Sequence, residues 1–230
     1  MTTLHVHPTT ELAERVLLPG DPGRALLLAQ SLLEQPKMFN HNRGLWGYTG
    51  TAADGAPLTI QSTGMGGPSA AIVVEELVRL GARRLVRVGT CGALVGGFAL
   101  GDALVATEAI AADGTSRALG AAPRVPGDPA LTAALLAAAE ADGGARSGPV
   151  VTTDLFYDEA GGHAEPPAGD ALAIEMEAAT VLRIATLRGV QAGCVLIVSD
   201  LLGPARGRID ADALETAARR VGRIAAAALS

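Results

Sequence analysis

The sequence contains little of what marks several large classes of protein. Only two of its residues are cysteines, Cys91 and Cys194, and both lie in apolar surroundings. We therefore expect buried, reduced thiols in a cytoplasmic protein rather than a disulfide framework. The four histidines show no zinc-ligand spacing with these cysteines, so no metal site is expected. Uninterrupted apolar runs of about 18 residues are missing, and no charged segment leads into an apolar core at the N-terminus, so we expect neither a membrane span nor a secretory signal.

Positive charge is also in short supply. The 18 lysines and arginines are outnumbered by 24 aspartates and glutamates, which gives a formal net charge of -6. The chain thus lacks the basic excess of a broad nucleic-acid-binding face, and no nucleic-acid partner is expected. Aromatic residues make up only 3%, but hydrophobic residues make up 49%, which is typical of a globular protein. A length of 230 residues suits one α/β domain over residues 1–230.

Short apolar runs typical of β-strands recur along the chain, and helical patterns lie between several of them. Strands are expected at 15–19, 57–63, 84–90, 102–110, 149–155 and 193–200. Helices are expected at 23–35, 68–81, 129–142, 175–189 and 211–229, and a surface loop at 159–169. This alternation predicts an α/β fold with helices on both faces of a largely parallel or mixed sheet. In such folds ligands bind at the carboxyl ends of the strands.

Two of these strand ends carry arginines. In LLPGDPGRA, Gly20 permits a close backbone approach, the free amides of the next helix favour an anion, and Arg24 suits phosphate. An ordinary turn with a capping Asp21 explains the same residues equally well. In RVGTCGAL, Arg87 lies among valines and leucines and Thr90 lies at the end of the strand. A buried arginine needs a partner, which is either an anionic ligand or a structural carboxylate.

Other strand ends carry acids. Glu175 and Glu177 open an expected helix in EMEAAT, where acidic residues commonly interact with the helix dipole. Carboxylates beside a cleft can also accept hydrogen bonds from sugar hydroxyls. Asp200 ends the apolar run GCVLIVSD, and an unpaired carboxylate is unfavourable away from water. Its place at a strand end indicates that Asp200 faces a cleft instead of the core.

Nucleotide-binding loops are absent. In STGMGGPSAA, Ser69 stands where the GxGxxG loop of dinucleotide enzymes needs its third glycine. No GxxxxGK[ST] loop occurs either. Neither a dinucleotide-dependent oxidoreductase nor a nucleoside triphosphate site is therefore favoured.

Eight segments, taken in order, resemble the nucleoside phosphorylase-I family, and especially its hexameric purine nucleoside and uridine phosphorylase branches. They are LHVHP, LLPGDPGRA, NRGLWGYTG, STGMGGPSAAIVVEEL, RVGTCGAL, DLFY, EMEAA and VSD. The resemblance implies an α/β fold around a mixed, twisted, distorted barrel-like sheet, and a homohexamer built as a trimer of dimers. It implies the reversible phosphorolysis of a nucleoside to a free base and ribose 1-phosphate. Inorganic phosphate is then a co-substrate, and no cofactor is expected.

The resemblance also implies roles for particular residues. Those that match the phosphate site are Gly20, Arg24, Arg87, Thr90 and, from the neighbouring subunit, Arg43. Those that match the ribose site are Met176, Glu177 and, from the neighbouring subunit, His5. Those that match the base pocket are Cys91, Gly92, Phe156, Glu175 and Ser199. Asp200 matches the acid that protonates a departing purine at N7.

The motifs favour a purine base. The pyrimidine branch of the family has a glutamine–arginine pair after its counterpart of DLFY, and DLFYDEAGGHAEPPAGD contains neither residue. The pyrimidine branch also has no acid at the position of Asp200. However, STGMGGPSAAIVVEEL is closer to the uridine branch, so a uridine phosphorylase is the first alternative. A water-using nucleosidase lacks the phosphate arginines, and a non-catalytic nucleoside-binding protein would not need the acid.

One expected side chain has two candidates. The purine branch carries an arginine beyond its aspartate that approaches the acid during catalysis. In SDLLGPARGRID, Arg206 and Arg208 are both available for that role.

Overall fold

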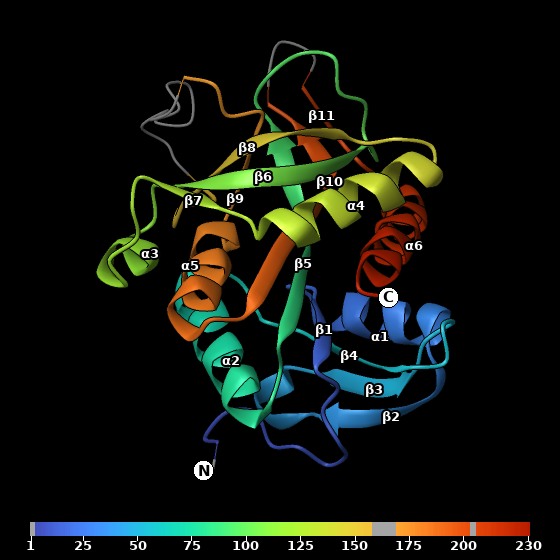
Figure 1. Cartoon of the computed structure of the whole chain (residues 1–230). Coiled ribbons are helices and arrows are strands. Elements are labelled where there is room, and N and C mark those ends of the chain that lie inside the picture. The colour runs from blue at the N-terminus through green and yellow to red at the C-terminus, as the bar shows by residue number, and fades with distance from the viewer. Residues whose placement is uncertain (1–2, 158–168, 203–205) are drawn as a thin grey trace.

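The computed structural model describes residues 3–157, 169–202 and 206–230 (Figure 1). These residues form a single-domain α/β fold, which confirms the predicted fold class. The expected surface loop at 159–169 lies outside the described residues, except for Gly169. None of the helices within the described ranges combines the length and apolar character needed to cross a membrane.

Eleven strands of the described residues join into one mixed sheet. They are β1 Arg15–Leu18, β2 Glu34–Asn40, β3 Gly47–Thr51, β4 Pro57–Gln61, β5 Arg84–Ala93, β6 Ala103–Ala111, β7 Arg124–Pro126, β8 Arg146–Thr152, β9 Ala173–Glu175, β10 Gln191–Leu201 and β11 Gly207–Arg208. Their order is β11-β10-β6-β8-β9-β5-β1-β4-β3-β2, with β7 paired to β6. Because β10 also pairs with β5, strands β5, β10, β6, β8 and β9 close into a ring. The sheet is therefore barrel-like, as expected from the family resemblance.

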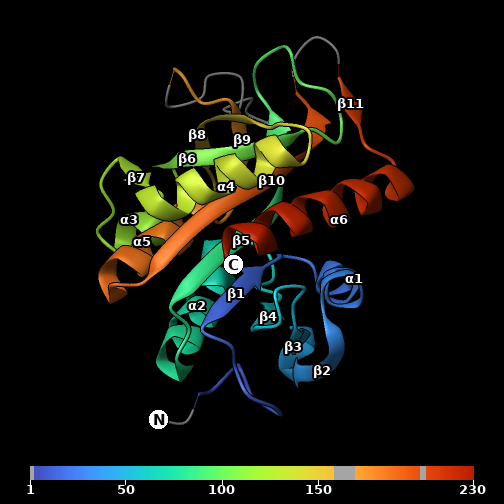
Figure 2. The same cartoon turned by 45° about the vertical axis from the view of Figure 1, so that its right-hand side comes forward.

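Helices cover both sides of this sheet (Figures 1 and 2). They are α1 Pro22–Leu32, α2 Gly67–Leu80, α3 Gly114–Ala118, α4 Pro129–Ala141, α5 Ala178–Arg188 and α6 Ala211–Ala228. Helices α1, α4 and α6 pack together around one apolar cluster, and α2 packs with α5 in another. Alternate residues of β10 enter the two clusters: Val195 and Ile197 enter the first, and Leu196 and Val198 enter the second. Because both faces of β10 are buried, its sequence is continuously apolar.

The sequence specifies most helix starts locally. An aspartate precedes four helices and accepts a hydrogen bond from the backbone N–H three residues further on, which satisfies an otherwise free donor. These aspartates are Asp21, Asp113, Asp128 and Asp210. Proline occupies the first turn of α1, α2 and α4, where its missing N–H has no cost. Because α1 begins directly after β1, this capping fixes the chain at the strand end where Gly20 lies.

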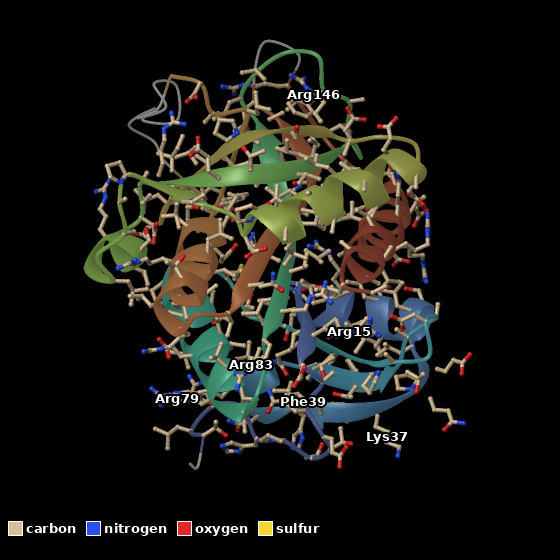
Figure 3. The ribbon with its side chains drawn as sticks, in the orientation of Figure 1. Arg15, Lys37, Phe39, Arg79, Arg83 and Arg146 are labelled. Atoms are coloured by element: carbon tan, nitrogen blue, oxygen red, sulfur yellow. The ribbon has the colours of Figure 1, made fainter. Side chains whose placement is uncertain are left out.

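A buried arginine anchors β1. Arg15 donates through Nη2 to Asp54 at 2.6 Å and through Nε to the carbonyl of Pro57 at 2.7 Å. It also donates to the carbonyl of Leu229 at 3.3 Å, at the end of α6. Arg15 is labelled in Figure 3. These bonds connect the start of β1 to the loop before β4 and to the C-terminal helix.

Several predicted boundaries are wrong. The expected helix at 23–35 ends at Leu32, because residues 34–40 form β2. The expected helix at 175–189 begins at Ala178, because residues 173–175 form β9 between β5 and β8. Strands β2, β3, β7, β9 and β11 were not predicted. They are short or have exposed faces, so their sequences lack the apolar runs that identify buried strands.

Candidate active site

A cavity of about 690 Å³ lies at the carboxyl ends of β1, β5 and β10. Most of the residues singled out in the sequence border it: Gly20, Arg24, Arg43, Arg87, Thr90, Cys91, Gly92, Phe156, Glu175, Met176, Glu177, Ser199 and Asp200. Strand β5 pairs in parallel with both β1 and β10, which brings three strand ends together. Side chains far apart in the sequence thus share one cleft, as expected for ligand sites of α/β sheets.

Arg87 lies between two carboxylates below the cavity. Its Nε donates to Glu175 Oε2 at 2.9 Å, and its Nη2 lies 2.5 Å from Glu177 Oε2. Although burial by itself lowers the pKa of Arg87, the two glutamates raise it overall. The sequence left open whether Arg87 pairs with an anionic ligand or with a structural carboxylate. The structure contains the structural carboxylate, Glu175. Nη1 has no partner among the described residues and is the atom of Arg87 that can contact an anion.

The position of Glu175 differs from the expectation of a base-pocket side chain. The residue is 4% exposed, but its side chain is wholly buried, so only its backbone borders the cavity. Its carboxylate accepts hydrogen bonds from Arg87, from the Thr152 hydroxyl and from the backbone N–H groups of Glu177 and Ala178. Glu175 thus holds Arg87 and the start of α5. This role could not be read from the residue pattern, because β9 was not predicted.

Glu177 is the carboxylate that remains closer to the cavity. One oxygen accepts a hydrogen bond from the backbone N–H of Gly66, and the other pairs with Arg87. Burial raises the pKa of Glu177, and the charge of Glu175 adds to this effect while Arg87 opposes it. The left-handed backbone of Gly66, with φ of 83°, turns its N–H toward this carboxylate.

Arg24 supplies a positive charge that forms no ion pair with any carboxylate of the described residues. Within the described residues it forms no ion pair, because Asp21 accepts from the Arg24 backbone N–H and caps α1. Burial lowers the pKa of Arg24, while Asp21 opposes this shift and the nearby Arg87 adds to it. A Cβ atom at Gly20 would lie 3.1 Å from the carbonyl oxygen of Gly64, so glycine permits this close approach. A half-buried cation beside a helix N-terminus is a suitable environment for an anion.

Arg43 and His5 were both predicted to come from a neighbouring subunit. Arg43 is exposed, has a left-handed backbone with φ of 58°, and borders the cavity of its own chain. His5 does not border that cavity, and its Nδ1 lies 2.9 Å from Glu76 Oε1. A single chain does not test the contribution of a neighbour, so both assignments stay predictions.

Glu76, which the sequence analysis missed, fixes the N-terminal segment that carries His5. Its carboxylate accepts hydrogen bonds from the backbone N–H groups of Leu4, His5 and Val6, at 3.1, 2.9 and 2.7 Å. Although burial by itself raises the pKa of Glu76, these hydrogen bonds and the one with the His5 ring lower it to about 2. Glu76 lies in the segment STGMGGPSAAIVVEEL, but its partners lie about seventy residues away, so sequence spacing carried no signal for this contact.

Asp200 lies at the end of the cavity bordered by Gly92 and Leu202. Its side chain is 23% exposed, and Ser199 Oγ donates to its Oδ2 at 2.7 Å. Strand β11 pairs with β10 so that Arg208 stands directly opposite Asp200. Arg208 Nε lies 3.8 Å from Asp200 Oδ1, and Arg208 borders the cavity, whereas Arg206 does not. Of the two candidate arginines, Arg208 is therefore the one beside the acid.

The remaining base-pocket candidates are mostly apolar. Burial raises the pKa of the Cys91 thiol, and its Sγ donates to the carbonyl of Ile197 at 3.5 Å, so it is a packing group rather than a nucleophile. Phe156 is 56% exposed and meets Tyr157 edge-on, with ring centroids 5.0 Å apart. Leu202 also borders this region and was not predicted. A flat, apolar ring fits such a lining.

Comparison with known proteins identifies the family. The family model described as the phosphorylase superfamily matches residues 14–230. The chain belongs to the phosphorylase superfamily. This result confirms the resemblance read from the motifs and the prediction of an enzyme of the pentosyltransferase class.

Three curated relatives of this phosphorylase have similar levels of identity. It is 41% identical to a protein named guanosine phosphorylase from Halorubrum lacusprofundi, over 82% of this chain and 78% of the relative. It is 39% identical to a uridine phosphorylase from Treponema pallidum, over 82% of this chain and 78% of the relative. It is also 39% identical to a DeoD-type purine nucleoside phosphorylase from Bacillus cereus, over 83% of each chain. Identity alone therefore does not separate purine from pyrimidine substrates, and the residues of the cavity must decide.

Proposed function

We propose that the protein catalyses the reversible phosphorolysis of purine nucleosides to a free purine and ribose or deoxyribose 1-phosphate. The observation that carries this proposal is that Asp200 faces the same cavity as the unneutralised Arg24. The guanidinium of Arg87 lies over Gly89, since its Nη2 is 2.6 Å from the ideal Cβ position of that glycine. Gly92, which pairs with Asp200, lies three residues further on, or about 10 Å along an extended strand. This spacing leaves room for a sugar and a base between the anion site and the acid.

The chemistry follows from charge development. A phosphate oxygen forms a bond to C1′ of the sugar while the bond between C1′ and N9 of the base breaks. The electron pair of the broken C1′–N9 bond moves to the base. Positive charge develops on the sugar, where bound phosphate stabilises it, and negative charge develops on the departing purine. Asp200 in its acid form gives its proton to N7 of the purine, which neutralises the leaving group. General acid catalysis of this kind typically contributes about 10²–10⁴-fold in rate.

The other predicted contacts complete this scheme. Phosphate is bound by Arg24, by Nη1 of Arg87, by Thr90 and by the backbone at Gly20. Arg43 of the neighbouring subunit adds a further charge, since charged donors are strong partners for a dianion. Glu177 accepts hydrogen bonds from the ribose 2′- and 3′-hydroxyls, Met176 packs on the sugar, and His5 of the neighbouring subunit contacts the 5′-hydroxyl. Cys91, Gly92, Phe156 and Ser199 line the base. No cofactor is required.

This scheme includes a homohexamer with shared sites. Large apolar side chains are exposed on the N-terminal segment, where Leu4 is 74% exposed, and just before α2, where Met65 is 86% exposed and borders the cavity. The size of the assembly rests on the family resemblance alone.

A uridine phosphorylase is the second candidate, because one relative of similar identity carries that name. Asp200 favours the purine reading, since a pyrimidine has no N7 to protonate. A panel of adenosine, inosine, guanosine, methylthioadenosine and uridine, each with and without phosphate, separates the candidates. We expect purine cleavage that depends on phosphate. Cleavage without phosphate would instead indicate a nucleosidase, and no cleavage would indicate a binding protein.

The role of Asp200 is tested with Asp200→Asn, which keeps the shape of the side chain and removes the acidic proton. We expect kcat for inosine to fall by about two orders of magnitude or more, with the KM for phosphate little changed. Asp212→Asn, on the exposed first turn of α6, is the matched control and should retain full activity. Unchanged turnover in Asp200→Asn would remove Asp200 from the mechanism.

A further inference from the structure

Arg208 is the arginine beside the acid, and neither the motifs nor the family comparison assigns it a contact with the base. It lies on the two-residue strand β11, directly across from Asp200, and it borders the cavity. Its side chain is 73% exposed, and among the described residues its one ion-pair neighbour is Asp200. The distance of 3.8 Å between Arg208 Nε and Asp200 Oδ1 exceeds hydrogen-bond range. The five N–H donors of this guanidinium are therefore available to a ligand beside Asp200.

A purine bound with N7 at Asp200 presents a second group to the same place. N7 and the substituent at C6 lie on one edge of the ring, as they do in the major groove of DNA. In guanine and hypoxanthine that edge carries two acceptors, N7 and O6, whereas adenine carries the acceptor N7 and the donor N6–H₂. An arginine guanidinium can donate hydrogen bonds to the acceptors of guanine and hypoxanthine. Opposite the amino group of adenine, its N–H donors would face another donor.

We propose that Arg208 selects 6-oxopurine nucleosides over 6-aminopurine nucleosides by donating to O6 while Asp200 holds N7. This inference rests on the proposed function and names the substrate class of the same site. It requires the base to lie in the cavity over the face of the β10–β11 pair, where the paired residues Asp200 and Arg208 both border it. Ser199 already donates to Oδ2 of Asp200, so Oδ1, on the Arg208 side, is the oxygen left for N7.

The exposure of Arg208 makes it a good subject for substitution. Its side chain supports no other described contact, so removing it leaves the ring of strands and both apolar clusters intact. Arg208→Leu keeps an apolar stem at the cavity and removes all donors. Arg208→Lys keeps the charge but replaces the planar set of N–H donors with a single ammonium group on a flexible stem. Arg206→Leu is the matched control, because Arg206 is exposed on the same segment and does not border the cavity.

The test measures kcat/KM for inosine, guanosine and adenosine at saturating phosphate in the four proteins. We expect the wild type to prefer inosine and guanosine, and Arg208→Leu to lower the ratio of inosine to adenosine about tenfold or more. Arg208→Lys should give an intermediate ratio, and Arg206→Leu should keep the wild-type ratio. Binding of hypoxanthine and of adenine, each with phosphate and measured by calorimetry, should change in the same way without turnover.

Two results overturn the inference while leaving the proposed function standing. One is a wild type that cleaves adenosine at least as well as inosine. The other is an Arg208→Leu variant in which both substrates lose activity equally, which would make Arg208 a partner of Asp200 without a role in selection. If the wild type cleaves no purine nucleoside in the presence of phosphate, the proposed function fails, and the inference fails with it.

Discussion

The most informative substitution in the cluster below the cavity is Glu175→Gln. It keeps the size of the side chain and replaces one carboxylate oxygen with an NH₂ group. Oε1 accepts from the Thr152 hydroxyl and from the backbone N–H of Ala178 at 3.0 Å. Oε2 accepts from Arg87 Nε at 2.9 Å and from the backbone N–H of Glu177 at 2.8 Å. An NH₂ group at Oε2 would face the N–H donors of Arg87 and Glu177, so glutamine fits only with its NH₂ group at Oε1, toward the Thr152 hydroxyl. In that orientation Arg87 keeps a hydrogen bond but loses a compensating charge.

The size of the effect follows from burial. Removing one partner of a buried ion pair typically costs about 3–5 kcal/mol, because the other charge is left uncompensated. Arg87 keeps Glu177 at 2.5 Å, so we expect the lower end of this range, about 3 kcal/mol. For a chain of this length, such a loss lowers Tm by about 6–12 °C. The displaced Arg87 should also raise the KM for phosphate.

Urea unfolding of the wild type and the variant, at one protein concentration, measures the change in the free energy of unfolding. Glu140→Gln is the control, because Glu140 is exposed on α4, and its effect should stay within about 0.5 kcal/mol. A loss below about 1 kcal/mol for Glu175→Gln would refute the view that this carboxylate holds Arg87 and the start of α5.

Two further predictions concern other charges. Arg24→Ala should raise the KM for phosphate by about tenfold or more, because a charge-assisted contact is worth about 1.5–3 kcal/mol, and it should leave the free energy of unfolding near that of the wild type. Steady-state kinetics with varied phosphate measures this KM. The control is Arg79→Ala, because Arg79 is exposed at the end of α2 (Figure 3). Glu76 has its pKa lowered from 4.5 to about 2, so its stabilising contribution is complete above pH 4.5 and is lost as the pH falls toward 2. Glu76→Gln should flatten the stability profile over that range in urea titrations, and an unchanged profile would contradict the assignment.

Three members of the candidate site could be read from the residues alone because each stands at or near the end of an apolar strand, whereas most of the others came from the family resemblance. Gly20 follows β1, Thr90 lies near the end of β5 and Asp200 near the end of β10. Those three strands are buried, so their apolar runs are visible in the sequence, and parallel strands bring their carboxyl ends to one edge. The chemical identity of the residues at that edge then follows by inspection.

The contacts between side chains of the site could not be predicted from the sequence in the same way. Arg87 meets Glu175 only because β9 inserts beside β5, and Asp200 meets Arg208 only because β11 pairs with β10. Strands of two or three residues have no periodicity to detect, so their partners are invisible to pattern analysis. Which carboxylate is structural and which faces the ligand therefore depended on the three-dimensional register.

The end of β10 illustrates how much that register decides. In a regular strand, neighbouring residues point to opposite faces, yet Ser199 and Asp200 both border the cavity. The pairing with β5 contains a bulge: Val198 stands opposite Cys91, but Asp200 rather than Ser199 stands opposite Gly92. A bulge re-aims the side chains around it, and here it lets Ser199 donate to Asp200 while both remain at the cleft. The chemistry expected of VSD thus depends on one extra residue in the strand, which its apolar sequence does not reveal.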